Sequence, residues 1–257
     1  MKSFLAPLSV AIALLISMSS AEAAFIAVKP IQICDDAGAN CANAGFFEAE
    51  TDKIWAQAGI DVRFLPTTKI NETDWLNVDY GNPLPQEPID MMEYARVNIN
   101  DSNVTLAINM FFVDSMPGLY GLGCGAPVYA GFCGAGRVGV FITDDVYTFN
   151  GGIGRLDTIA HELGHVLGLT HDDWGAGVAN NLMTAGIRTV PSTIDDISPD
   201  GAKLSQLTAA QITEVYNSAF IQVPEPGTFA LIALALASVT VLRRSSRQPV
   251  CRESSRT

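Results

Sequence analysis

Three histidines within eleven residues constrain the fold of this 257-residue chain more than any other feature of its sequence. His161 and His165 are four residues apart, and His171 follows after Gly168. On an α-helix, side chains four residues apart lie on one face, and a glycine can end the helix in the left-handed conformation that turns the chain back. The three imidazoles would then converge on one point. Such a set binds zinc and leaves one coordination position open, so we expect one catalytic Zn²⁺ ion here.

Glu162 directly follows the first predicted ligand and is our candidate for the general base. Its carboxylate would take a proton from a zinc-activated water and return it to the leaving amine. Taken alone, Glu162 could be an exposed helix charge, and a lone histidine is more often an ordinary core or surface residue. Here the chain has only three histidines, and all of them occupy positions that a metal site needs. The pattern therefore favours metal-dependent hydrolysis.

The segment from His161 to His171, HELGHVLGLTH, resembles the extended zinc signature of metzincin metallopeptidases. The resemblance implies an α+β (mixed α/β) fold with a mixed twisted sheet, an active-site helix, a small C-terminal helical part and a cleft for a peptide or protein substrate. It also implies that Met183 supports the metal site from a tight turn and that Asp172 is a buried structural carboxylate. Some metzincins have a tyrosine two residues after this methionine as an additional zinc ligand, whereas this chain has Ala185.

Hydrophobic periodicity predicts the remaining elements. Apolar residues alternate or run continuously in the predicted strands and recur every three or four residues in the predicted helices. The polar stretch 67–102 is interpreted as an insertion with one short helix over 89–96, and the segment between the last two strands as a Gly-rich loop. We expect strands over 25–33, 60–65, 104–113 and 138–142, and helices over 46–58, 151–168 and 204–219.

Residues 1–23 resemble a secretory signal peptide, with a basic Lys2, an apolar run and small residues at the end. Its removal would leave a zinc metallopeptidase domain over 24–222. An exported domain folds in an oxidising compartment, where its cysteines can pair. We expect the disulfides Cys34–Cys41 and Cys124–Cys133 because each pair is close in sequence, although four cysteines allow three connectivities.

Residues 223–247 contain Pro-Glu-Pro, an apolar run over 229–242 and then three arginines. This order resembles the PEP-CTERM sorting signal of Gram-negative bacteria, which implies an exosortase-type processing enzyme as a partner. The alternative is a plain membrane anchor, although about 15 apolar residues are short for the ~20 that a span needs. The arginines predict that 248–257 form a cytoplasmic tail, which leaves Cys251 unpaired. We therefore expect export to the cell surface or extracellular matrix, with membrane attachment only through this segment before processing.

The net charge limits the partners of the predicted domain. The whole chain carries −12, and residues 25–222 contain 24 acidic against 9 basic side chains, or about −15. Such a charge argues against nucleic acid as a partner. Two other functions stay open: a non-catalytic zinc-binding module of the extracellular matrix, and a zinc hydrolase that acts on something other than peptides.

Overall fold

The computed structural model describes residues 23–99, 106–125, 130–134 and 136–224. Residues Ala23–Gln222 form one compact unit. Residues 1–22 of the predicted signal peptide, the apolar run over 229–242 and Cys251 lie outside the described residues. Within the described part of the chain, no helix is both long and apolar enough to cross a membrane.

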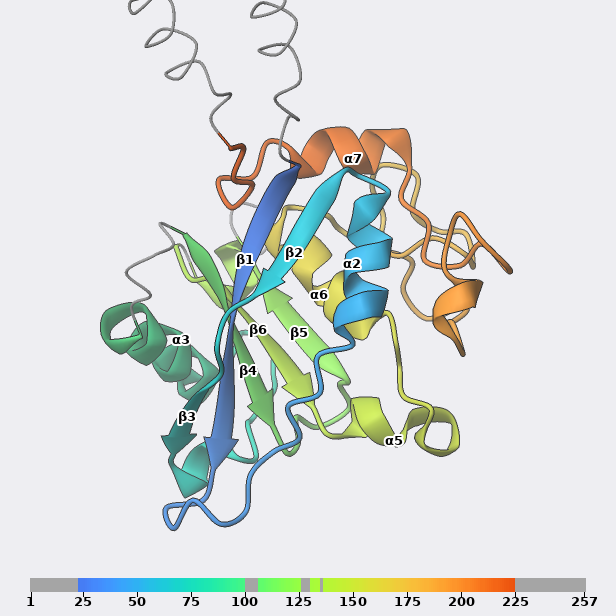
Figure 1. The fold of residues 1–257 in the computed structure, drawn as a ribbon. Coiled ribbons are helices and arrows are strands. Elements are labelled where there is room, and N and C mark those ends of the chain that lie inside the picture. The colour runs from blue at the N-terminus through green and yellow to red at the C-terminus, as the bar shows by residue number, and fades with distance from the viewer. Residues whose placement is uncertain (1–22, 100–105, 126–129, 135, 225–257) are drawn as a thin grey trace, which may run out of the picture. The chain divides into compact units, whose positions relative to one another are not determined.

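The compact unit is built on a mixed six-stranded sheet, which Figure 1 shows with its strong twist. Its main path runs in the order β2-β1-β4-β6-β5, and β3 pairs with the second half of β1. All neighbours are parallel except β5, which lies antiparallel to β6 at one edge. The strands are β1 (Ala24–Cys34), β2 (Ile60–Phe64), β3 (Thr68–Asn71), β4 (Ala107–Val113), β5 (Gly121–Cys124) and β6 (Gly139–Thr143).

Helices cover both faces of the sheet. Figure 1 shows α3 on one side of the strands and α2 and α6 on the other. On β4, Phe111 stacks on Phe141 on the face that carries Gly139, next to Met92 of α3. The next residue, Phe112, points to the opposite face, as alternation requires, and contacts Phe46 just before α2. The helices are α2 (Glu48–Ala56), α3 (Gln86–Asn98), α4 (Ala130–Cys133), α5 (Asp145–Gly152), α6 (Thr158–Val166) and α7 (Ala209–Val215), with 3₁₀ turns η1 (Thr73–Trp75) and η2 (Ile194–Asp196).

The expected fold class, a mixed sheet with an active-site helix and a small C-terminal helical part, is confirmed. Four details of the sequence interpretation were wrong. Strand β5 occupies part of the predicted Gly-rich loop, and β3 lies in the predicted insertion. The helix expected over 151–168 begins only at Thr158, because Gly151, Gly152 and Gly154 all have positive φ. The last helix is limited to α7, which is shorter than the range 204–219.

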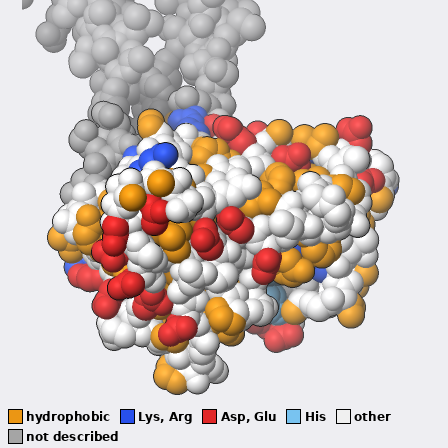
Figure 2. Space-filling view, turned by 90° about the horizontal axis from the view of Figure 1, so that it is seen from below, with side chains coloured by type: hydrophobic (Ala, Val, Ile, Leu, Met, Phe, Trp, Pro, Cys, Tyr) orange, Lys and Arg blue, Asp and Glu red, His pale blue; other side chains and the backbone are white. Residues whose placement is uncertain are grey.

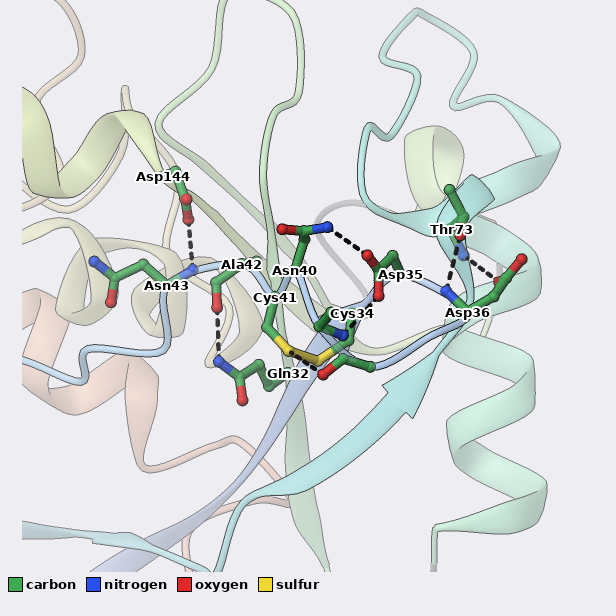
Figure 3. The surroundings of a disulfide bond; sticks show 12 residues. Gln32, Cys34, Asp35, Asp36, Asn40, Cys41, Ala42, Asn43, Thr73 and Asp144 are labelled. Carbon is green, nitrogen blue, oxygen red and sulfur yellow. Dashed lines mark hydrogen bonds between the residues drawn. A yellow bond between two sulfur atoms is a disulfide. The ribbon is translucent and has the colours of Figure 1, made fainter.

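Both expected disulfides are present, and the first closes the loop that follows β1. Figure 3 shows Cys34–Cys41 with the polar contacts around it. Asp35 accepts hydrogen bonds from the Ala39 amide and from the Asn40 side chain within this loop. Asp36 and Thr73 exchange two hydrogen bonds of 2.9 Å, which tie the loop to η1. The paired aspartates therefore stabilise their own loop.

Candidate metal centre and active-site cleft

The three histidines meet at one point, as their spacing predicts. Helix α6 is buried along all nine residues, and His161 and His165 lie on it with 5% exposure each. Gly168 then turns the chain with a φ of 104°, and this returns the half-buried His171 to the helix. Its Nε2 atom lies 3.1 Å from Nε2 of His161 and 3.0 Å from Nε2 of His165. These three residues are the one His/Cys/Asp/Glu cluster suited to a metal among the described residues.

Backbone carbonyls fix the orientation of two of these rings. Nδ1 of His161 lies 2.7 Å from the Leu182 carbonyl oxygen, and Nδ1 of His165 lies 2.9 Å from that of Leu169. A carbonyl only accepts, so each Nδ1 carries the proton that it donates. The Nε2 atoms are then left with lone pairs, the tautomer that binds a metal.

This geometry fits zinc. The His171 Nε2 atom lies 3.0–3.1 Å from the other two Nε2 atoms, and lone pairs at this distance repel each other unless a cation lies between them. Two nitrogens that bind one zinc ion at about 2.0–2.1 Å and the tetrahedral angle are about 3.3 Å apart, close to the spacing found. The three-histidine cluster therefore provides a site of the right donor type and size for a zinc ion.

Burial keeps the three imidazoles neutral. It is the main cause that lowers the pKa of all three, to about 3 for His165 and well below its usual value for His161. The positive charge of Arg188 lowers the pKa of His161 further. Since a metal binds the neutral ring, the site is ready to bind zinc at neutral pH.

Glu162 lies in the same cleft as the histidines and is only 7% exposed. Burial raises the pKa of its carboxyl to about 7, although Arg188, Arg155 and a hydrogen bond from the Gly123 amide act in the opposite direction. A carboxyl with a pKa near the working pH exchanges protons readily. Its position and its pKa both suit a general base.

Met183 lies beneath the active-site helix. It is fully buried, and a Cβ atom added to Gly164 would come within 2.6 Å of its sulfur, so the turn packs directly against α6 between the two helical histidines. Its amide donates to Asn181 Oδ1, and the Asn181 side chain exchanges two hydrogen bonds with Gln211 of α7. Helix α7 thus holds the turn that supplies the Leu182 carbonyl.

Asp172 is not the buried structural carboxylate that the resemblance implied. Its side chain is exposed, because the chain after His171 runs along the surface, and its neighbour Asp173 accepts a hydrogen bond from Thr170. The buried carboxylate behind the site is Asp157, which has no exposed surface and accepts a hydrogen bond from Ser205.

Asp157 forms a buried ion pair with Arg188. Neither residue was predicted from the sequence. Nε of Arg188 lies 2.9 Å from Asp157 Oδ2, and the two side chains are 4% and 0% exposed, although this N–H does not point at that oxygen. Nη1 of Arg188 lies 2.6 Å from His161 Nδ1 and 3.2 Å from the Leu182 oxygen. Metal binding through Nε2 requires His161 Nδ1 to keep its proton, so Arg188 must donate to the Leu182 carbonyl and not to the imidazole.

A cleft of about 540 Å³ opens over the histidines and Glu162. Strand β5 forms one wall, and a Cβ atom at Gly123 would collide with the Glu162 carbonyl oxygen. At Gly125 an added Cβ atom would lie 2.7 Å from the Val166 backbone. The glycines in this edge strand and directly after it therefore allow the chain to approach α6 more closely than any side chain would permit. The Cys124–Cys133 disulfide joins the end of β5 to α4.

The predicted insertion 67–102 also contributes to the cleft. Tyr80 and Asn82 line it, and the Tyr80 ring lies 6.0 Å from that of Phe132, which belongs to the disulfide-linked α4. The sequence showed no function for this stretch because Tyr80 is far from the histidine motif along the chain.

Two family models match parts of this chain. The model of the metallopeptidase family M12B, reprolysin-like, matches residues 49–172, and the model of the PEP-CTERM protein-sorting motif matches residues 222–245. No curated protein matches the chain. Among solved structures, a zinc-dependent peptidase from Methanocorpusculum labreanum is similar with a TM-score of 0.38 and 10% identity, over 72% of this chain and 98% of that one. The M12B match contains all three histidines, so the resemblance to metzincin-type zinc metallopeptidases with a PEP-CTERM sorting signal is confirmed.

Proposed function

We propose that this protein is an exported zinc metalloendopeptidase of the metzincin type. In this proposal His161, His165 and His171 bind one catalytic zinc ion, and Glu162 is the general base. The observation that carries it is the convergence of the three histidines, with His171 Nε2 at 3.0–3.1 Å from Nε2 of both others, in the cleft that also contains Glu162. When bound, zinc would polarise the scissile carbonyl and make the attacking water more acidic.

The residues of the chain supply the remaining chemistry. Glu162 takes the proton of the attacking water and gives it to the leaving amine. The Glu162 side chain packs against Gly121, where an added Cβ atom would lie 2.8 Å from its Cγ, and this contact positions the base against the edge strand. Met183 and Gly168 support the metal site from below and from the turn before His171. Asp172 is left without a role in this mechanism.

The sorting motif supports export. A PEP-CTERM segment implies processing by an exosortase-type enzyme and delivery to the cell surface. We therefore propose a signal peptide over 1–23, the peptidase domain over 24–222, the sorting segment over 223–247 and a short tail over 248–257. A disulfide-linked domain is consistent with an oxidising compartment outside the cytoplasm.

Metal analysis of the purified protein tests the proposal first. We expect one zinc ion per chain, loss of peptide cleavage after chelation, and recovery when zinc alone is returned. His165→Ala should lose the metal because it removes one of three ligands, whereas Asp172→Ala, an exposed neighbour of the site, should keep it. A protein without stoichiometric zinc, or one whose cleavage survives complete metal removal, would contradict the assignment.

A further inference from the structure

A second cation lies in the cleft beside Glu162. Arg155 lines the cleft just before α6, and its guanidinium carbon is 4.7 Å from the centre of the Tyr120 ring and 5.7 Å from that of Phe149. The rings hold the flat guanidinium group in place, as cation–π contacts do. Arg155 is half-buried, so its charge acts in a partly desolvated space.

Arg155 has no ion-pair or hydrogen-bond partner for its side chain among the described residues. The nearby buried carboxylate, Asp157, is already paired with Arg188. The Nε atom of Arg155 is buried without a hydrogen bond, and burial followed by the charge of Arg188 lowers its pKa. A guanidinium in this state gains free energy from any carboxylate that reaches it.

A second unpartnered polar group belongs to a residue that lines the same cleft. Thr158, on the first turn of α6, lines the cleft and is 1% exposed. Its Oγ1 is buried and has no hydrogen-bond partner among the described residues. Buried polar groups are nearly always satisfied, so Arg155 and Thr158 each lack a partner that such groups usually have.

We propose that Arg155 forms a subsite that binds a carboxylate of the substrate. The inference rests on the proposed peptidase function and names its substrate class: peptides with an acidic side chain, or a chain end, near the scissile bond. The planar guanidinium suits a two-oxygen acceptor, which a carboxylate presents. Glu162 does not take this place, because no ion pair joins it to Arg155 among the described residues.

Matched peptides test the subsite. Each pair has Glu or Gln at one position around the cleavage site, and a second set has a free or an amidated C-terminus. We expect kcat/KM of the wild type to favour the charged member by about 10–100-fold at one position, the range for a hydrogen-bonded charge. Arg155→Gln should bring that ratio close to 1, and Arg155→Lys should retain part of it. The ratio compares two peptides on one variant. A general loss of packing around Tyr120 would lower kcat/KM for both peptides alike and would leave the ratio unchanged.

Controls separate this inference from the proposed function. Arg96→Gln removes an exposed arginine of α3 outside the cleft lining and should keep the wild-type ratio. Binding of the same peptide pairs to zinc-loaded Glu162→Ala protein, measured by calorimetry, reports the carboxylate preference without catalysis. Peptides cleaved with no preference for charge, an unchanged ratio in Arg155→Gln, or equal binding of both members would overturn the subsite. Absence of all peptide cleavage together with a clear binding preference would instead refute the peptidase function.

Discussion

Glu162 is the residue where the requirements of folding and of catalysis conflict most. Its pKa is raised to about 7 by burial, whereas the pKa of an unfolded glutamate is near its usual value of 4.5. The folded state therefore binds the proton more tightly. The stabilising contribution of protonated Glu162 is present below pH 4.5 and is lost as the pH rises through 7. In the zinc-free protein, ionised Glu162 therefore destabilises the folded state.

Glu162→Gln should reveal this cost in the zinc-free protein. The amide stays neutral, so the variant should unfold at a higher urea concentration than the wild type at pH 8, by at most about 3 kcal/mol. The difference should shrink towards zero near pH 4.5, where both side chains are neutral. Glu48→Gln, at an exposed position of α2, is the matched control and should show no such trend. A difference independent of pH would contradict the raised pKa.

At the scale of elements, the sequence predicted the helices and strands whose apolar residues follow a clear pattern. Strands β1, β4 and β6 are buried on both faces, and their apolar runs made them visible. Strand β5 was not predicted, because glycines are typical of loops. The structure needs them where β5 packs against α6. The histidine cluster was predictable because its residues lie within eleven positions. Arg188 and Asp157 were missed because 31 residues separate them, and only the folded chain brings them together.

The Asp157–Arg188 pair joins the start of α6 to the segment after the Met183 turn. Arg188→Met should destabilise the protein by about 3–5 kcal/mol, because Asp157 would remain buried without its cation. Asp157→Asn combined with Arg188→Met should recover part of this loss, since a neutral amide costs less to bury and keeps its contact with Ser205. Urea unfolding of the three proteins measures both changes. If Arg188→Met alone is as stable as the wild type, the ion pair contributes little to the free energy of unfolding.

At the scale of the whole molecule, an acidic domain surrounds a cleft that carries positive charge. The chain has a net charge of −12, and Figure 2 shows many Asp and Glu side chains but few Lys or Arg on the face seen from below. Arg155 and Arg188 both line the cleft. The surface field therefore repels anionic substrates at long range, and the arginines attract them only inside. Added salt screens long-range repulsion more than buried contacts, so it should speed cleavage of acidic peptides more than of neutral ones.

The most direct test of the account compares wild-type and Glu162→Ala protein, both with their zinc content measured, on a broad peptide library. Glu162 is not a ligand in the proposed site, so the variant should keep one zinc ion per chain. Its cleavage rate should fall by at least ~10²–10⁴-fold, the contribution of general acid–base catalysis. A variant that keeps its zinc and cleaves as fast as the wild type would contradict the role of Glu162. A wild-type protein with full zinc that cleaves no peptide would instead favour the non-catalytic zinc-binding module.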